Sequence, residues 1–358
     1  MLFHHFGFLL VGQAFYAEYR ATFGLWSGVD LFLCISGFII AKGYYFQFSH
    51  APSGKLLPIA ISFWIRRFFR LAPAAWLWLA VAVLVFSVTG VAPLRNNLSD
   101  AIAAFFGFAN LHWWNCLNAR SLCGGIGNYW SLSLEEQFYW LFPAIFLLPK
   151  RLHLWMILAI AAIQLPIPRA HWSPQVWPFF RTDAIALGIA VFLLSQSAWH
   201  AKLKPAFMDN KLVGAITLLV LLMLFAACST PEGKPEAAIA PFAMGLVALV
   251  SAALVFLASY NKNWLLNFGI IRSALLWVGG RSYALYLIQA VAFYTCKPLL
   301  DAEVVVSALP PSLLPVVSCV TVFGLMGVLA EMNYRFVEVP LRTRGARIAR
   351  AYLERRIN

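Results

Sequence analysis

Asn128-Tyr-Trp-Ser-Leu-Ser-Leu-Glu-Glu-Gln-Phe-Tyr-Trp140 brings two adjacent carboxylates, Glu135 and Glu136, into a very hydrophobic chain. The pattern predicts a helix that starts near Ser133, because Ser133 can cap the first turn and Glu136, three residues later, can reach back to it. Glu135 is not needed for this capping box, although an acid in a first turn gains from the helix dipole. Glu135 is therefore the better candidate for a functional role, and Glu136 for a structural one.

The chain around this stretch is strongly apolar. Of its 358 residues, 62% are hydrophobic and 11% are charged, and the mean hydropathy is +0.77. This composition excludes a soluble domain with one or two cores and indicates a polytopic membrane protein. We predict an all-α fold of about ten transmembrane helices, from apolar runs near residues 1–16, 28–46, 72–92, 134–149, 153–166, 178–197, 212–229, 238–260, 274–296 and 312–333. Several runs are shorter than the roughly 20 residues that a perpendicular span needs, so tilted or merged spans and a re-entrant segment near 99–111 are alternatives.

The distribution of Lys and Arg predicts the orientation of these spans. If the N-terminus is cytoplasmic, 20 of the 27 Lys and Arg residues fall in cytoplasmic segments, as the positive-inside preference requires. An even number of spans with both termini in the cytoplasm therefore fits. The net charge of +13 then reflects topology rather than a nucleic-acid-binding surface. We divide the chain into a transmembrane domain, residues 1–333, and a basic cytoplasmic tail, residues 334–358, which we expect to lie against anionic lipid headgroups.

The cysteines give no indication of a metal site. Six cysteines are present, and their spacing matches no metal-binding motif. Only Cys116 and Cys123, which share one polar loop, are placed to form a disulfide. We therefore expect no bound metal.

Ionisable and small residues interrupt the first two apolar runs. His4 and His5 lie where a membrane helix is normally apolar. An ionisable residue there is costly enough to suggest a function, although a structural histidine facing a lumen is the alternative. Asp30 lies near the outer end of the second run in this topology. Deeper in the same run, Ser36 and Gly37 allow another helix or a ligand chain to approach closely, and packing alone explains such a pair equally well.

Two arginines follow at helical spacing. In the stretch Ile61-Ser-Phe-Trp-Ile-Arg-Arg-Phe-Phe-Arg-Leu-Ala-Pro73, Arg67 and Arg70 fall on one face of a predicted helix, just inside the membrane. Two stacked guanidinium groups on the cytoplasmic side suit a phosphate-rich donor such as a coenzyme A. Anchoring by the positive-inside preference explains a basic cluster here equally well.

Six motifs in order resemble the acyltransferase 3 family of integral membrane O-acyltransferases. Each motif alone is weak, but together they cover essentially the whole chain. They are Val29-Asp-Leu-Phe32 with Ile35-Ser-Gly-Phe38, Arg66-Arg-Phe-Phe-Arg-Leu-Ala-Pro73, Trp130-Ser-Leu-Ser-Leu-Glu-Glu-Gln-Phe-Tyr139, Arg181-Thr-Asp183 with Gly188, Ser282-Tyr-Ala-Leu-Tyr-Leu-Ile288, and Glu338-Val-Pro-Leu-Arg342.

The resemblance implies a ten-helix protein of the bacterial cytoplasmic membrane that passes an acyl group, usually acetyl from cytoplasmic acetyl-CoA, to a carbohydrate hydroxyl. The family's first-helix motif is an Arg, ten residues, and then a His thought to be catalytic. The His matches His4, with His5 as second choice, and the Arg has no counterpart. We expect the first helix to be truncated at its N-terminus, and the alternative is that this protein lacks that Arg. The family's paired arginines match Arg67 and Arg70, its motif glutamate matches Glu135, and its Ser-Gly pair matches Ser36 and Gly37. Gln289 is a departure, because many relatives have His at that position.

A mechanism follows from acyl-transfer chemistry, which needs a base for the alcohol and a donor for the oxyanion. We expect His4 or His5 to act as the base, directly or through an acylated intermediate, with Asp30 or Glu135 orienting the imidazole. Arg67 and Arg70, with the Ser36-Gly37 pair nearby, would bind the acyl-CoA. Glu135, Arg181 and Asp183 would lie toward the carbohydrate acceptor.

Two other classes of protein share some of these features. A transporter or flippase of lipid-linked sugars would also show about ten spans with a few buried charges, but it gives no reason for the Arg67 and Arg70 pair. An unrelated membrane acyltransferase fold would share the chemistry without the Ser-Gly and Trp-Ser-Leu motifs. Consumption of acetyl-CoA separates the flippase from either enzyme.

Overall fold

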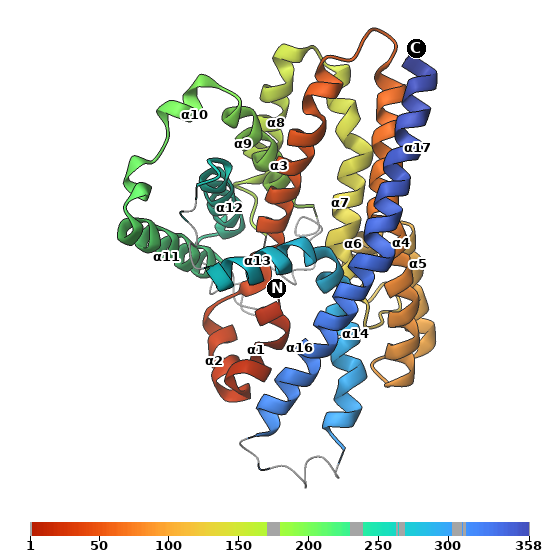
Figure 1. Ribbon diagram of the computed structural model, residues 1–358. Helices are drawn as coiled ribbons and strands as arrows, with labels where there is room; N and C mark the ends of the chain where they lie inside the picture. Colours follow the sequence, from red (N-terminus) through yellow and green to blue (C-terminus); the bar gives the residue numbers. More distant parts are fainter. Residues whose placement is uncertain are drawn as a thin grey trace.

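The computed structural model describes residues 2–169, 180–229, 239–262, 264, 269–302, 310 and 313–357, and every regular element in these residues is helical (Figure 1). Short 3₁₀ or π segments join several of the helices: η1 (Leu25–Ser27), η2 (Gly127–Tyr129), η3 (Phe142–Leu147), η5 (Ala206–Asp209) and η7 (Tyr334–Glu338). The α-helices are α1 (Leu2–Val11), α2 (Gln13–Thr22), α3 (Gly28–Ser49), α4 (Leu56–Val88), α5 (Leu94–Phe105), α6 (Ala109–Leu117), α7 (Trp130–Leu141), α8 (Lys150–Gln164), α9 (Thr182–Ser195), α10 (Ala198–Lys202), α11 (Lys211–Cys228), α12 (Ala243–Ser259), α13 (Gly269–Gly280), α14 (Ser282–Leu300), α16 (Leu314–Asn333) and α17 (Val339–Ile357).

The long apolar helices are the candidates for membrane spans. In the described part of the chain, four helices are long and apolar enough to cross a bilayer: Gly28–Ser49, Leu56–Val88, Lys211–Cys228 and the continuous segment Leu314–Arg356. Two shorter apolar helices are Thr182–Ser195 and Ala243–Ser259. The all-helical class is thus confirmed, while the ten spans and the orientation of the termini stay predictions.

Several apolar runs are not single helices. The run at 1–16 divides into α1 and α2 at Gly12, whose φ of 84° favours glycine and ends the first helix. The run at 274–296 divides into α13 and α14 at Arg281. The segment near 99–111 is likewise two short helices, α5 and α6. Breaks of this kind are tolerated at membrane depth only where protein surrounds the backbone.

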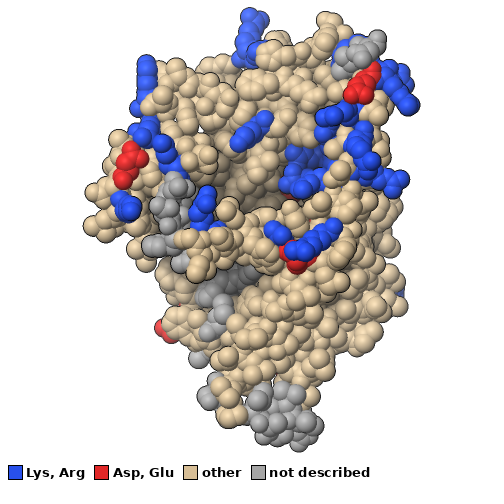
Figure 2. All heavy atoms as spheres, in the orientation of Figure 1, with Lys and Arg blue, Asp and Glu red and all other residues tan. Residues whose placement is uncertain are grey.

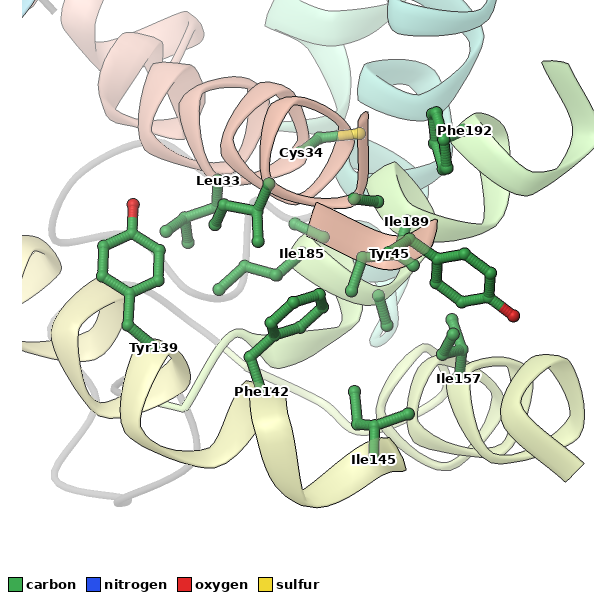
Figure 3. Packing of buried hydrophobic residues seen from close by; sticks show 14 of the residues in the cluster. Leu33, Cys34, Tyr45, Tyr139, Phe142, Ile145, Ile157, Ile185, Ile189 and Phe192 are labelled. Atoms are coloured by element: carbon green, nitrogen blue, oxygen red, sulfur yellow. The ribbon is translucent and has the colours of Figure 1, made fainter. Parts of the chain in front are cut away.

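Helix α3 lies at the centre of one packed core and runs along α9 (Figure 3). Glycines bring the two backbones together. A Cβ at Gly37 would lie 2.1 Å from the carbonyl oxygen of Ile185, and one at Gly188 would lie 2.0 Å from that of Cys34. The Ser-Gly pair of the sequence therefore uses its glycine for helix packing, as small residues do in membrane proteins.

Helix α17, the predicted basic tail, is docked on the first half of α4 (Figure 1). Ser62 donates a hydrogen bond to the carbonyl of Ala349 at 3.2 Å, and Lys55 donates one to the carbonyl of Arg356 at 2.6 Å. Buried Gly345 lies against the ring of Phe69. The arginines of α17 stay exposed on its other face, and Figure 2 shows that Lys and Arg on this side of the molecule gather in its upper half, around α17 and the ends of neighbouring helices.

Candidate active site

Helix α7 begins three residues earlier than the capping pattern predicts. It starts at Trp130, and no side chain caps it. Ser133 lies inside the helix, where its hydroxyl accepts a hydrogen bond at 3.1 Å from the backbone N–H of Ala109 on α6. The predicted capping box at Ser133 and Glu136 is therefore wrong, because a tertiary donor on α6 occupies the hydroxyl. Glu135 lies in the second turn of α7 and not in the first.

Glu135 is buried and is held by two hydroxyl groups. Ser36 on α3 and Tyr139, one turn further along α7, both donate hydrogen bonds to Oε1 of Glu135. The structure thus brings together Ser36 and Glu135, two residues that the sequence places 99 positions apart.

Arg67 lies beside the same tyrosine. Its guanidinium carbon is 5.1 Å from the ring centre of Tyr139, 5.3 Å from that of Tyr44 and 5.7 Å from that of Phe63. Arg67 is buried, and its Nε has no hydrogen-bond partner among the described residues. These residues also provide no ion pair to Arg67 within 4.0 Å. Aromatic faces therefore hold this cation without neutralising it.

Arg70 differs from Arg67 in its surroundings, because it is exposed on α4. It belongs to a group of basic residues, with Arg281 and Arg342, whose charges act on Glu338. Arg281 itself forms an ion pair with Glu331 at 2.8 Å. The paired arginines of the sequence thus give one buried cation and one exposed cation at the junction of α4, α14 and α17.

A second cluster joins α3 and α9 through two buried ion pairs. Arg181 donates to Asp30 at 2.8 Å, and Arg169 donates to both carboxylate oxygens of Asp183, at 2.9 and 2.5 Å. All four side chains are at most 3% exposed. Three of these residues are sequence candidates, and the structure brings them together.

Arg169 is the member that sequence reasoning missed. Arg169 follows the apolar run 153–166 and belongs to none of the six motifs. Asp30 and Asp183 both lie within apolar runs with Arg181 as the single cation near them in sequence. Because a buried carboxylate needs a partner, that imbalance of charge was the available signal.

Aromatic and amide groups complete this second cluster. The guanidinium of Arg181 lies 4.4 Å from the ring centre of Trp26 and 5.1 Å from that of Trp130, at the start of α7. Gln164 at the end of α8 accepts hydrogen bonds from the backbone N–H groups of Thr182 and Asp183, at 3.1 and 3.2 Å. Gln164 thereby caps α9 and holds Asp183 in its first turn.

Three helices begin around one cavity beside this cluster. The cavity has a volume of about 330 Å³ and is lined by residues at the starts of α3, α7 and α14 and by one residue of α13: Val29, Phe32, Ser131, Leu132, Val278, Ser282, Tyr283, Leu285, Tyr286 and Gln289. Helix N-termini carry partial positive charge. The cavity is therefore a suitable place for a group that gains negative charge during a reaction.

His4 and His5 lie on α1, which packs near the same helix α14. The rings of Phe6 and Phe8 contact Phe293 with centroid distances of 5.2 and 5.8 Å. Phe293 follows the cavity residue Gln289 by one helical turn. The side chain of His4 lies outside the described residues, whereas His5 is described beside Phe6.

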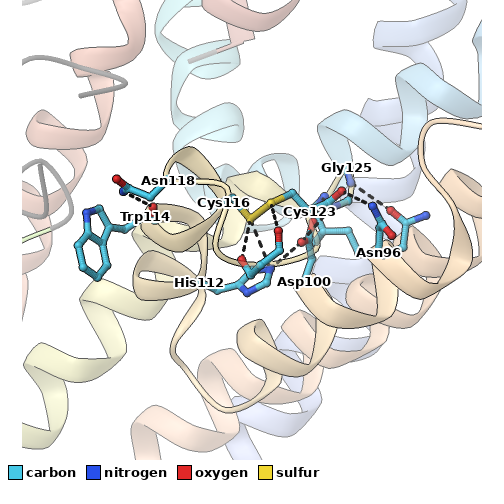
Figure 4. Close-up of a disulfide and its surroundings, with 12 residues drawn as sticks. Asn96, Asp100, His112, Trp114, Cys116, Asn118, Cys123 and Gly125 are labelled. Atoms are coloured by element: carbon cyan, nitrogen blue, oxygen red, sulfur yellow. Dashed lines mark hydrogen bonds and ion pairs between the residues drawn. A yellow bond between two sulfur atoms is a disulfide. The ribbon is translucent and has the colours of Figure 1, made fainter. Parts of the chain in front are cut away.

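The predicted disulfide between Cys116 and Cys123 is present, with the two Cα atoms 5.6 Å apart (Figure 4). Next to it, Asp100 accepts hydrogen bonds from His112 at 2.9 Å and from the backbone N–H groups of Gly124 and Ile126 at 3.0 Å. Asp100, His112 and Cys116 are close enough to suggest a metal site, but the sulfur of Cys116 is bonded to another sulfur and is no thiolate ligand. The cluster orders the loop that leads into α7.

The long apolar helices and the buried polar clusters define an integral membrane protein with charged side chains in its interior. A profile of the family described as "Acyltransferase domain" matches residues 1–330, so the chain belongs to that family. It is 26% identical over 356 residues to a Listeria monocytogenes protein named peptidoglycan O-acetyltransferase, with 93% of this chain and 54% of that protein aligned. A Bacillus subtilis protein, to which the same name is assigned provisionally, is 25% identical over 351 residues. The alignment covers 89% of this chain and 51% of the Bacillus subtilis protein. The chain thus spans about half the length of the curated relatives it matches. No solved structure matches it.

Proposed function

We propose that this protein is a membrane O-acyltransferase that moves an acetyl group from a cytoplasmic acyl-CoA to a hydroxyl of an exported carbohydrate in the bacterial cytoplasmic membrane. Membership of the acyltransferase family and the names of the relatives support this reaction class. By analogy with those names, the first acceptor to test is the glycan of peptidoglycan. Acetyl-CoA is a substrate in this scheme, and we invoke no metal.

The observation that carries the proposal is the buried charge of Arg67. It has no ion pair among the described residues and a free Nε–H, and aromatic rings hold it in place. A buried cation without a counter-ion is expensive, so a ligand anion is its natural partner. The phosphates of coenzyme A provide such an anion, and an arginine fork suits them. Arg70 supplies a second charge at the protein surface, where the nucleotide end of the donor would remain.

The chemistry assigns roles to the remaining candidates. The acceptor hydroxyl attacks the thioester carbonyl, its proton passes to a base, and the coenzyme thiolate leaves. We assign the base to His4 or His5, because a neutral imidazole can accept the proton of an attacking hydroxyl group. The starts of α3, α7 and α14 face the cavity and would stabilise the oxyanion. Asp30, Arg181 and Asp183 would position the acceptor side, and Glu135, held by Ser36 and Tyr139, would orient the imidazole.

Mass spectrometry of cell-surface glycans tests the proposal. Deletion of the gene should remove a modification of acetyl mass, and wild-type protein should restore it. We expect either His4→Ala or His5→Ala to fail, because general-base catalysis is worth about 10²- to 10⁴-fold in rate. His50→Ala, on an exposed histidine at the end of α3, is the matched control. Unchanged acylation with reduced glycan export would instead favour a transporter. Transporters also have interrupted membrane helices around a central binding site.

A further inference from the structure

The cavity at the starts of α3, α7 and α14 contains a polar atom that the protein leaves without a partner. Gln289 lines this cavity and is only 1% exposed. Its Nε2 donates a hydrogen bond to the carbonyl of Tyr286 at 3.2 Å, and Oε1 has no partner among the described residues. Because a carbonyl can only accept, the contact with Tyr286 fixes the orientation of the amide.

The hydroxyl groups of Ser131, Tyr283 and Tyr286 in the cavity wall form hydrogen bonds within the protein, whereas Ser282 is exposed at the start of α14. Tyr286 donates its hydroxyl hydrogen to the carbonyl of Asn128 at 2.6 Å, and its oxygen lies 2.6 Å from the hydroxyl of Ser131. Tyr283 donates to the carbonyl of Leu71 at 2.9 Å. Among the described residues of the wall, the buried polar atom without a partner is therefore the acceptor Oε1 of Gln289. A buried acceptor left unpaired costs free energy, so the site is matched to a ligand with an N–H or O–H donor.

The chemistry of the wall distinguishes between two kinds of hydrogen-bond donor. A sugar ring carries several hydroxyl groups and needs several polar partners. Five of the ten described lining residues have hydrocarbon side chains, namely Val29, Phe32, Leu132, Val278 and Leu285, and none of the ten is charged. A slender chain in which methylene groups separate amide groups needs fewer polar partners than a sugar, and it fits this wall better.

We infer that this cavity binds the pantetheine arm of the acyl donor, with an amide N–H of the arm hydrogen-bonded to Oε1 of Gln289. The inference rests on the proposed function and adds a binding residue to it. The arm would then place the thioester among the starts of α3, α7 and α14. There Asp30 and Arg181 lie next to the lining residue Val29 and the aromatic contact Trp130.

Two truncated donors of equal length test this contact in the purified full chain. S-acetyl-N-acetylcysteamine keeps one amide next to the thioester, and an S-acetyl alkanethiol replaces that amide with methylene groups. Acetyl transfer to a soluble peptidoglycan fragment is measured with both donors and with acetyl-CoA. We expect wild-type protein to prefer the amide donor by about tenfold in kcat/KM, the effect of one buried hydrogen bond.

Variants of Gln289 identify the residue responsible. Gln289→Met keeps the length of the side chain but removes the acceptor, and it should abolish the preference between the donors. Gln289→His provides a ring nitrogen that can accept, and it should retain most of the preference. Thr295→Val, an exposed position further along α14, should leave the preference unchanged. The readout is a ratio within one preparation, so partial loss of folded protein does not affect it.

The outcomes separate this inference from the proposed function. If acetyl-CoA supports transfer but wild type and Gln289→Met discriminate equally between the truncated donors, or wild type does not discriminate at all, the cavity does not bind the amide through Gln289. If acetyl-CoA itself supports no transfer, the proposed function fails, and the donor assignment fails with it.

Discussion

Ser36 on α3 donates a hydrogen bond to the carboxylate of Glu135 on α7, and Tyr139 donates a second one to the same oxygen. The ring of Tyr139 in turn lies 5.1 Å from the guanidinium of Arg67. One tyrosine therefore links the buried acid and the buried cation of the proposed donor site. Such networks are cooperative, because each member orders the next.

Removing either hydroxyl should weaken activity without unfolding the protein. We expect Ser36→Ala and Tyr139→Phe each to lower the rate of acetyl transfer by about tenfold, since each removes one hydrogen bond to a charged group. The double variant should lose less than the product of the two effects, because the residues share one acceptor. Acetylation kinetics on purified protein measure this. Strictly multiplicative losses would show that the two hydroxyl groups act independently.

Donor binding should require the planar guanidinium group of Arg67 and not only its positive charge. We expect Arg67→Lys to raise the KM for acetyl-CoA by about 10- to 100-fold, because an ammonium group cannot replace a guanidinium held between rings and phosphates. Arg151→Lys, at an exposed arginine near the start of α8, is the control and should leave KM unchanged. An equal change in both variants would point to a general effect of surface charge.

The two glycines between α3 and α9 should tolerate no side chain. Gly37→Ala and Gly188→Ala would each push a Cβ to about 2 Å from a backbone carbonyl oxygen, and overpacking of this kind costs about 1–3 kcal/mol. We expect a lower melting temperature for both in detergent. Gly43→Ala lies on the same helix α3 with no atom within 4 Å of the new Cβ, and should be neutral or slightly stabilising. A loss at Gly43 as large as at Gly37 would contradict this packing.

Removing one partner of a buried ion pair should destabilise the protein more than removing one partner of a surface ion pair. Asp30→Asn removes the carboxylate that forms the ion pair with the buried guanidinium of Arg181, and breaking a buried ion pair costs about 3–5 kcal/mol. We expect a large loss of folded protein, measured by size-exclusion profile and melting temperature. Asp209→Asn breaks an exposed pair with Lys204 and should have little effect. Similar losses in both variants would argue against a special role for the buried pair.

Thiol counting tests the disulfide and the side of the membrane on which its loop lies. Cys116 and Cys123 are bonded, and the other four cysteines are free. Alkylation of denatured protein should therefore add four labels without reductant and six with it. Since disulfides form in oxidising compartments, a bonded pair in protein from growing cells would place this loop outside the cytoplasm. Six labels without reductant would remove that support for the topology.

Local patterns in the sequence were sufficient for the helical class, for the helix that carries Arg67 and Arg70, and for the pairing of Cys116 with Cys123. Each depends on composition or on residues close together in the chain, where spacing alone fixes which side chains share a face or a loop. The same local reasoning failed at Ser133, because its hydroxyl binds a backbone N–H of another helix. It also missed the break at Gly12, where a positive φ divides an apolar run.

Partners and burial were decided only by the tertiary structure. The sequence by itself determined that a few polar residues enter an apolar interior, and that each must find a partner there. It did not determine that Ser36 meets Glu135, that Arg169 pairs with Asp183, or that Gln289 faces a cavity with a free acceptor. These contacts join residues from separate helices, so they depend on how the helices pack. The free energy of a buried polar atom depends on whether that packing provides a partner.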